Sequence, residues 1–397
     1  MSDLDTFRSE TRSWLEANCP ASMRTPQKRS EAVYGGRNAS FPSDDAKLWM
    51  ERMVEKGWTA PEWAPEYGGA GLSRAESKVL GQEMESFGCR KPLTGHGFWM
   101  LGPALLEYGT EEQKLQHLPK IARGEIRWCQ GYSEPGAGSD LASLRCKAED
   151  KGDHFLVNGQ KCWTSGGEES DWIFCLVRTS SEGKKQEGIS FLLFDMATEG
   201  VSTHPVPLIT GDSHFCDTFF DNVAVPKENL VGELNKGWSV AKALLVHERS
   251  MMSELERNMP KPKYDLLGYA QNYLQKRSDG RLADGAMRAR IAENLMEKQA
   301  VDLSQQRAFE EGAAGVFDMR VASIFKYVGT ENQQLREELI VDILGHTALL
   351  WGSEKASDDE QEKTYGWMSG KAITIAGGSS EVQLNLVAKK SLGLPER

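Results

Sequence analysis

Two short stretches near the middle of the chain constrain its fold more than any other part of the sequence. Residues 132–140 combine proline with glycine, alanine, serine and aspartate, which favours a tight loop with backbone N–H and C=O groups free to meet a ligand. Residues 155–163 are typical of a β-hairpin, with Asn158 and Gly159 as the turn between two short strands. Together they predict a polar ligand site on a β-scaffold, with the aromatic side chain of Trp163 at its wall.

The hydrophobic pattern of the sequence changes twice along the chain, from helical to strand-like and back. Helical periodicity dominates residues 1–126, where Ser73 and Thr110 are each followed three residues later by Glu or Gln, the pattern of a capping box. Short apolar runs separated by Gly, Pro, Asn and Asp fill residues 127–236 and predict a β-domain, and the helical period returns in residues 237–397. The clearest strand-like runs are 154–157, 172–177, 189–194 and 218–225. We therefore expect an α+β chain of three domains with these boundaries.

Charge and composition limit the classes of partner. A formal net charge of −11 argues against nucleic acid and anionic membranes, so an anionic ligand must be held by local donors. No apolar run approaches the roughly 18 residues of a membrane span, and the acidic N-terminus lacks the features of a signal or transit peptide. Seven cysteines without a Cys-x-x-Cys pair and seven histidines without ligand spacing favour reduced thiols, no metal and a cytoplasmic location.

One acidic residue occupies an unusual place in the helix expected after residue 237. Glu248 falls in the middle of an apolar stripe whose members recur at spacings of three and four. The stripe consists of Ala241, Leu244, Leu245, Met251, Met252 and Leu255. A carboxylate there is either desolvated or faces a cleft. Desolvation raises the pKa of a carboxyl group toward the working pH, as a general base needs. The alternative is a structural ion pair with a distant Arg or Lys, because the adjacent Arg249 points elsewhere on a helix.

Five motifs in the same order resemble the acyl-CoA dehydrogenase family. Besides the two central stretches, they are residues 66–73 with Trp58 before them, residues 108–125, and residues 375–383. The resemblance covers most of the chain, and its tail and length are most similar to bacterial members. It implies an N-terminal helical domain, a central β-barrel-like domain and a C-terminal four-helix bundle.

The resemblance also implies a reaction and its partners. The cofactor would be FAD and the substrate an acyl-CoA thioester, which loses an α-proton to a carboxylate and a β-hydride to flavin N5. An electron-transfer flavoprotein would accept the electrons. The active form would be a homodimer or homotetramer, because this scaffold completes its flavin site with a neighbouring chain.

Individual site residues follow from the same resemblance. Ser133, Trp163 and Ser165 match positions at the flavin ring, with the indole of Trp163 packed on the flavin. Gln130 and Ser139 match positions that line the flavin and the CoA thioester side. Taken one by one, such residues are usually ordinary turn, strand and core residues. Their occurrence within two paired motifs favours the ligand-binding role.

Family members carry the catalytic base at one of two places. In one branch it lies where this chain has Glu248, and the following arginine, here Arg249, helps to bind CoA. In the other branch it lies where this chain has Gly377, which has no acidic side chain. The backbone N–H of Gly377 can still donate to the thioester carbonyl and stabilise the developing enolate.

The helix that follows this glycine completes the expected site. Ser380 and Gln383 are expected to form a capping box at its start, with the positive end of the helix dipole near the site. Ser379 and Glu381 are assigned to the cofactor. Glu381 is also a weaker candidate for the base, since an acidic residue in a first helical turn is explained by the dipole.

Two family patterns that hold the adenosine half of FAD are missing. Arg281 or Arg288 could replace an Arg-x-x-Phe pair, and residues 342–346 stand where a Gln-x-x-Gly-Gly-x-Gly run is expected. Two other hypotheses therefore stay open: a flavin oxidase or N-hydroxylase on the same scaffold, and a partner subunit of a heteromeric dehydrogenase. The presence of Glu248 argues against a non-catalytic subunit.

Overall fold

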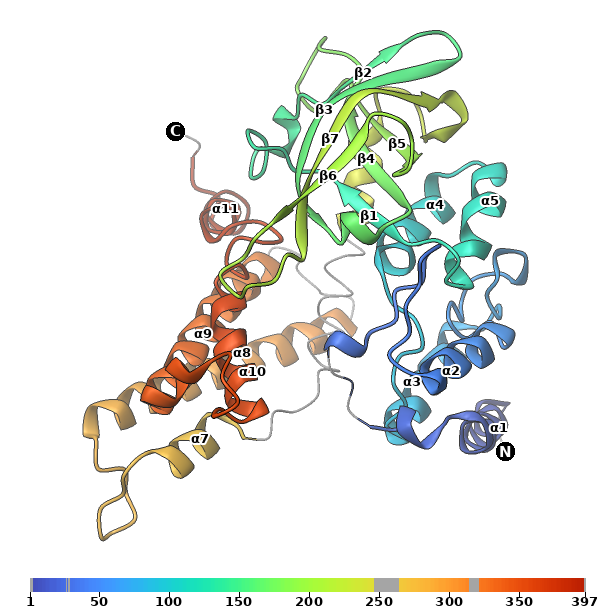
Figure 1. Ribbon diagram of the computed structural model, residues 1–397. Helices are drawn as coiled ribbons and strands as arrows, with labels where there is room; N and C mark the ends of the chain where they lie inside the picture. Colours follow the sequence, from blue (N-terminus) through green and yellow to red (C-terminus); the bar gives the residue numbers. More distant parts are fainter. Residues whose placement is uncertain (1–2, 26, 28, 246–263, 314–320, 396–397) are drawn as a thin grey trace. The chain divides into compact units, whose positions relative to one another are not determined.

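The computed structural model describes residues 3–25, 27, 29–245, 264–313 and 321–395 (Figure 1). The chain divides into two compact units, Met1–Pro207 with Ser213–Pro260, and Leu208–Asp212 with Lys261–Arg397. Each unit has hydrophobic clusters of its own. Among the described helices, none combines the length and the apolar character that crossing a lipid bilayer requires.

The first unit begins with five α-helices. They are α1 (Asp3–Asn18), α2 (Asp44–Glu55), α3 (Arg74–Ser86), α4 (Gly102–Tyr108) and α5 (Glu111–Ala122), with one π-helical turn, η4 (Gly97–Leu101), before α4. The capping boxes expected at Ser73 and Thr110 are confirmed at the starts of α3 and α5. Helix α1 is amphipathic and buries Thr11 and Leu15 against its neighbours.

An eight-stranded sheet follows in the same unit. Its strands are β1 (Trp128–Gly131), β2 (Lys147–Asp150), β3 (His154–Ser165), β4 (Trp172–Arg178), β5 (Ile189–Asp195), β6 (Val201–Val206), β7 (Phe215–Pro226) and β8 (Leu230–Val231). The order is β6-β7-β3-β2-β4-β5-β8, and β1 pairs with β4. The four strand-like runs of the sequence are confirmed within β3, β4, β5 and β7. The sequence did not predict β1, β2, β6 or β8, which are mostly shorter.

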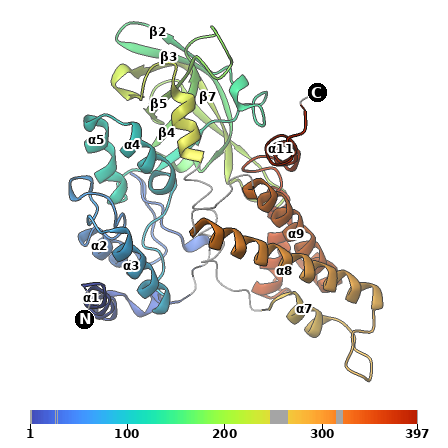
Figure 2. The same ribbon diagram turned by 180° about the vertical axis from the view of Figure 1, so that it is seen from behind.

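Both faces of this sheet are covered. In β4, Ile173 and Val177 point into a cluster within the sheet, whereas Phe174 and Leu176 point into a second cluster shared with helices. That second cluster includes residues of η4, α4 and α5 and of the helix that starts at Gly237, which lies against the strands in the view of Figure 2 (yellow). A strand buried on both faces is continuously apolar, as β4 is.

The hairpin predicted at Asn158 and Gly159 is wrong, because β3 continues through both residues as one strand of twelve. A Cβ atom at Gly159 would lie 2.7 Å from the Cα atom of Cys146, so glycine permits the close approach of the backbone segment that contains Cys146. The Asn158 side chain accepts a hydrogen bond from the backbone N–H of Asn222 at 2.9 Å, opposite a bulge in β7. In this strand, Gly159 allows close packing and Asn158 forms a cross-strand hydrogen bond, although this pair of residues often forms a turn in other proteins.

The second unit is helical. It contains α7 (Leu266–Tyr273), α8 (Gly285–Ala313), α9 (Val321–Leu344), α10 (Asp358–Gly370) and α11 (Ser380–Leu386), with shorter turns η8 (Gly345–Leu350) and η9 (Val387–Ser391). Helix α9 packs against the other four α-helices of this unit. Its residues Leu339, Ile340 and Ile343 form the centre of the core with Leu266 and Tyr269 of α7.

Candidate active site

The two central stretches meet in the first unit. The backbone N–H of Cys162 in β3 donates to the carbonyl of Ser133 in the loop at 2.9 Å. The ammonium group of Lys161 donates to the carbonyl of Tyr132 at 3.1 Å. The loop therefore lies across the middle of β3 and is tied to it by both main-chain and side-chain bonds.

A buried ion pair holds this junction. Lys161 is fully buried, and its Nζ lies 2.7 Å from Oε1 of Glu134, which is also buried. The same carboxylate accepts the backbone N–H groups of Arg145 at 2.6 Å and Cys146 at 2.9 Å. A buried pair with these extra hydrogen bonds leaves the loop a single well-defined position. We did not predict this pair, although the two-residue period from Phe155 places Lys161 on the inner face of β3.

Trp163 has an unusual backbone and an exposed ring. Its φ angle is 59°, which is rare for a bulky residue, and it lies where an extra residue on β3 shifts the register with β7. The side chain is 58% exposed and meets only the edge of the Phe215 ring, with centroids 5.8 Å apart, among the described aromatic contacts. A strained conformation that presents an aromatic face to solvent is typical of a binding site.

The remaining residues predicted around the flavin ring lie on neighbouring segments. Gln130 is on β1, and its Nε2 atom is buried with no hydrogen-bond partner among the described residues. Ser165 is half-buried at the end of β3, where it pairs with Phe215. Ser139 is exposed further along the loop, beyond the turn closed by Glu134 and Ala137. An unpaired buried amide costs about 1–3 kcal/mol, so an acceptor on a ligand would stabilise Gln130.

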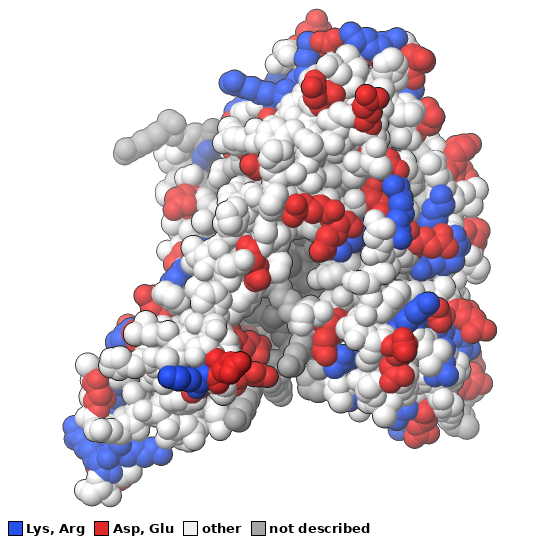
Figure 3. All heavy atoms as spheres, viewed as in Figure 1, with Lys and Arg blue, Asp and Glu red and all other residues white. Residues whose placement is uncertain are grey.

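A hollow of about 330 Å³ opens beside the same loop. Glu134, Pro135 and Gly136 form one side of it, and Gly159 and Gln160 of β3 form part of the other. Arg145, which is exposed, is the cation among its lining residues. On the face of the first unit that Figure 3 shows, acidic and basic side chains are interspersed. Recognition of an anion there would depend on individual groups, as the net charge indicates.

The glycine loop of the second unit has a left-handed backbone. The φ angles are 67° at Gly377 and 98° at Gly378, and a Cβ atom at Gly377 would meet no described atom within 4 Å. The Nε2 group of Gln383 in α11 donates to the carbonyls of both glycines, at 3.3 and 3.4 Å. The backbone N–H of Gly377 is thus part of a loop braced by a side chain that we did not assign to this role.

The capping box predicted at Ser380 and Gln383 is wrong. The N-cap is Ser379, whose hydroxyl accepts the N–H of Val382 at 3.4 Å. The cap therefore lies one residue earlier than predicted, and Ser380 instead donates to Oε1 of Glu331 at 2.6 Å. The third helical residue is then a valine, which has no group that could return a hydrogen bond.

Glu381 lies in the first turn of α11 and is exposed. Hydrogen bonds from its own backbone N–H and then from the Ser379 hydroxyl hold the pKa of this carboxyl below its ordinary value. A lowered pKa makes a carboxylate a weaker proton acceptor near neutral pH. The direction of this shift does not favour Glu381 as a general base.

The predicted base is not described by the structure. Glu248 and Arg249 lie outside the described residues, as do Met251, Met252 and Leu255 of the apolar stripe. The helix that starts at Gly237 is described as far as Leu245, and there Ala241 and Leu244 are buried in the core, with Leu245 packed against it. The inner face of this part of the helix agrees with the stripe expected from the sequence.

The two segments proposed to hold adenosine meet within the second unit. Arg290 of α8 donates to Oδ2 of Asp342 in α9 at 2.8 Å, and both side chains are partly exposed. Arg281 and Arg288 are exposed, and Arg281 pairs loosely with Asp279 at 3.9 Å. Among the described residues, no group of three or more His, Cys, Asp or Glu side chains could hold a metal ion.

Comparisons with known proteins agree along the whole chain. Residues 2–125, 129–223 and 235–392 match the models described as acyl-CoA dehydrogenase N-terminal, middle and C-terminal domain. Acyl-CoA dehydrogenase IpdE1 of Mycobacterium tuberculosis is 31% identical over all of this chain and 99% of its own length. Another curated relative is about twice as long, and this chain spans 47% of it.

Solved structures give the same result. A structure described as the Tcur3481-Tcur3483 steroid ACAD is 29% identical, with a TM-score of 0.72 over 100% of this chain and 99% of that one. The ChsE4-ChsE5 complex from Mycobacterium tuberculosis is also 29% identical, with a TM-score of 0.71 and the same coverage.

Proposed function

This chain belongs to the acyl-CoA dehydrogenase family, and from that premise we propose that it dehydrogenates an acyl-CoA thioester between the α and β carbons with FAD as its cofactor. The observation that supports this best is the junction at which the glycine-rich loop is tied to β3 beside Trp163. It joins the two motifs that would meet the flavin and fixes them through a buried ion pair.

The residues at this junction fit FAD. The unpaired Nε2 group of Gln130 can donate to a ring oxygen or nitrogen, and the exposed indole of Trp163 can pack on a planar ring. Ser133 of the loop and Ser165 at the end of β3 add hydroxyl groups to the junction. The chemistry that FAD supplies when bound is acceptance of a hydride from the β carbon.

The protein would supply the acid–base chemistry. We assign the α-proton to the Glu248 carboxylate, because the sequence pattern places it on an apolar stripe whose described members, Ala241 and Leu244, are buried in the core. The N–H of Gly377 would donate to the thioester oxygen and stabilise the charge that develops there. Arg249 and Ser139 would contact the CoA portion, and Ser379 and Glu381 would contact the cofactor.

The cofactor proposal has a direct test. The purified protein is expected to show the absorbance bands of a flavin or to acquire them when incubated with excess FAD and desalted. Failure to take up flavin under both conditions would remove the cofactor from the proposal. Rapid transfer of electrons to an electron-transfer flavoprotein, with slow reoxidation by air, would distinguish a dehydrogenase from a flavin oxidase or N-hydroxylase.

The substrate class is a separate proposal. One structural relative is described as a steroid ACAD, so a steroid-linked acyl-CoA is the first candidate for the acyl group. A panel would compare it with straight-chain acyl-CoA thioesters of short, medium and long chains, using an artificial electron acceptor. A higher kcat/KM for any straight-chain thioester would reject the steroid assignment and leave the reaction type intact.

A heteromeric assembly is the second candidate form of the enzyme. A second structural relative is a complex of two proteins, and the usual adenosine-binding patterns are missing around Arg281 and residues 342–346. Purification of this chain with and without its chromosomal neighbours would separate the two forms. A colourless chain that becomes yellow only with a second polypeptide would support the heteromer.

A further inference from the structure

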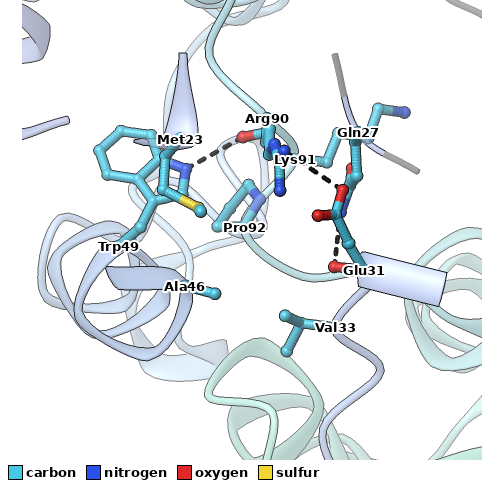
Figure 4. A pocket seen from close by; sticks show the side chains of 9 residues that line it. All are labelled: Met23, Gln27, Glu31, Val33, Ala46, Trp49, Arg90, Lys91 and Pro92. Carbon is cyan, nitrogen blue, oxygen red and sulfur yellow. Dashed lines mark hydrogen bonds and ion pairs between the residues drawn. The ribbon is translucent and has the colours of Figure 1, made fainter. Parts of the chain in front are cut away.

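Two hollows in the first unit differ greatly in size. The smaller one, of about 10 Å³, lies among the N-terminal helices and is bordered by Trp49 and Arg90, which are joined by a hydrogen bond from the indole to the Arg90 carbonyl at 3.0 Å (Figure 4). A space of this size holds about one water molecule. The larger one, of about 330 Å³, is lined in part by Ser143 and Arg145. The side chain that fixes this part of the wall is therefore of interest for ligand binding.

Arg178, the last residue of β4, joins two loops through its guanidinium group. On one side, Nη2 donates to the carbonyl of Ala142 at 2.6 Å, and Nε and Nη2 both donate to the carbonyl of Leu144 at 3.3 Å. On the other side, Nη1 donates to the carbonyls of Lys185 and Glu187, each at 2.9 Å. These bonds use all five N–H groups of the side chain, and every acceptor is a backbone oxygen.

The first of these loops is the one that would meet CoA. It comprises residues 139–145 and begins with Ser139, whereas the second loop, residues 179–188, connects β4 to β5. A further link between the loops is the ion pair of Lys185 with Asp140 at 2.5 Å, whose side chains are both more than half exposed. Exposed ion pairs hold segments together only weakly. The Arg178 guanidinium group is therefore the stronger of these two links.

Both loops also carry an exposed cation. Arg145 ends the first loop and Lys184 lies in the second, and neither side chain forms an ion pair among the described residues. The phosphate groups of CoA are anionic, and a chain with a net charge of −11 must bind them through such local groups. The relative position of the two loops would therefore affect how tightly CoA binds.

We propose that Arg178 is a positioning residue for CoA, because its guanidinium group holds residues 139–145 and 179–188 in one arrangement before the thioester binds. This inference rests on the proposed function, in which Ser139 contacts the CoA portion. Arg178 acts through the loops and not on the ligand, since its N–H groups are already bonded to backbone carbonyls. Loops that are ordered in advance lose less conformational entropy on binding, so the affinity for CoA is higher.

The first test is calorimetric titration of the whole protein, loaded with FAD, with coenzyme A. Arg178→Gln cannot bond to both loops, so the Kd for coenzyme A should rise by about tenfold or more while FAD affinity stays that of the parent. Arg123→Gln is the matched control, because its guanidinium group bonds to Glu125 and to neither loop, and it should change neither quantity. An unchanged Kd for coenzyme A, or an equal loss of FAD affinity, would overturn the positioning role. A parent protein that binds FAD but no coenzyme A would instead reject the proposed substrate.

Arg178→Lys separates the geometry of the side chain from its charge, and it decides the question even if Arg178→Gln does not fold. Lysine keeps the charge and the apolar stem but lacks the planar group that reaches both loops. The Kd for coenzyme A should therefore stay raised, and amide hydrogen exchange, measured by mass spectrometry, should quicken by about tenfold in both loops together. Coenzyme A binding as tight as that of the parent, or faster exchange in one loop alone, would contradict the proposal.

Discussion

Trp163 on β3 and Asn222 on the paired strand β7 both adopt a left-handed backbone conformation. Comparing the two residues allows the proposed cofactor role of Trp163 to be tested. Trp163 has φ 59° and Asn222 has φ 54°, each at a register shift. Such conformations cost about 1 kcal/mol or more in a residue other than glycine. Only Trp163 of the two presents an aromatic face to solvent. The strain at Trp163 agrees with the proposal that a ligand packs on its ring.

Trp163→Gly should weaken FAD binding by about tenfold or more, because it removes an aromatic packing surface, without lowering the free energy of unfolding. Asn222→Gly relieves similar strain on the partner strand and should leave FAD affinity unchanged. Both quantities are measurable by flavin fluorescence titration and denaturant unfolding of the cofactor-free protein. If Trp163→Gly binds FAD as tightly as the parent, the indole does not contact the flavin.

Glu248→Gln tests the base. The amide keeps the size of the side chain but cannot take up the α-proton, so substrate-driven flavin reduction should slow by at least about 100-fold. Glu233→Gln changes an exposed carboxylate a few residues before the helix that starts at Gly237, and this variant should reduce flavin at the parent rate. Stopped-flow absorbance with saturating acyl-CoA separates this step from binding. Reduction of Glu248→Gln at the parent rate would show that another group removes the proton.

At the scale of elements, α5 is attached to the sheet through a histidine between two tryptophans. The ring of His117 lies edge-on to Trp128 of β1 and Trp172 of β4, with centroids 5.2 and 5.0 Å apart, and is almost fully buried. Burial, followed by repulsion from Lys120, lowers the pKa of His117 to about 4. The folded state therefore holds this imidazole neutral at pH values where the unfolded chain already binds a proton.

The sign of the resulting pH dependence follows directly. Between pH 6.5 and 4 the unfolded state carries the extra proton, so stability falls as the pH falls. The loss attributable to His117 is about 3 kcal/mol at its largest. His117→Phe should flatten the plot of unfolding free energy against pH over this range. An unchanged slope, measured by urea unfolding at several pH values, would show that the loss comes from other groups, such as His96, whose pKa is also lowered to about 4 by burial.

The helices and strands differ in how far the sequence predicted them. Capping boxes predicted the starts of α3 and α5 correctly, because that signal is local. The turn signal at Asn158 and Gly159 failed because contacts with Cys146 and Asn222, distant in sequence, use the same residues. The Lys161–Glu134 pair also joins residues far apart in the sequence, which did not reveal it. Gln383 braces the glycine loop from only five and six residues away, but the sequence assigned it to a capping box instead.

At the scale of the whole molecule, the question is how the flavin site is completed. The family scaffold uses a neighbouring chain, and we expect residues 281–290 and 342–347 to make that contact. The Arg290–Asp342 ion pair joins these two segments here. Both side chains are partly exposed, and such a pair contributes only about 0–1 kcal/mol to the stability of its own chain. A charge reversal at this pair should therefore affect assembly more than folding.

We expect Arg290→Glu to lower FAD affinity and shift the protein from a dimer or larger oligomer toward the monomer, while its thermal midpoint changes little. The new carboxylate would face Asp342, and the repulsion would displace the two segments from the partner chain and the adenosine half of FAD. Arg307→Glu on the same helix disrupts a more exposed pair with Glu311 and should change neither property. Multi-angle light scattering and FAD titration measure both effects. Restored assembly in the Arg290→Glu/Asp342→Arg double variant would show that the pair itself holds the segments. Full FAD affinity in a monomeric Arg290→Glu protein would show that one chain completes the site alone.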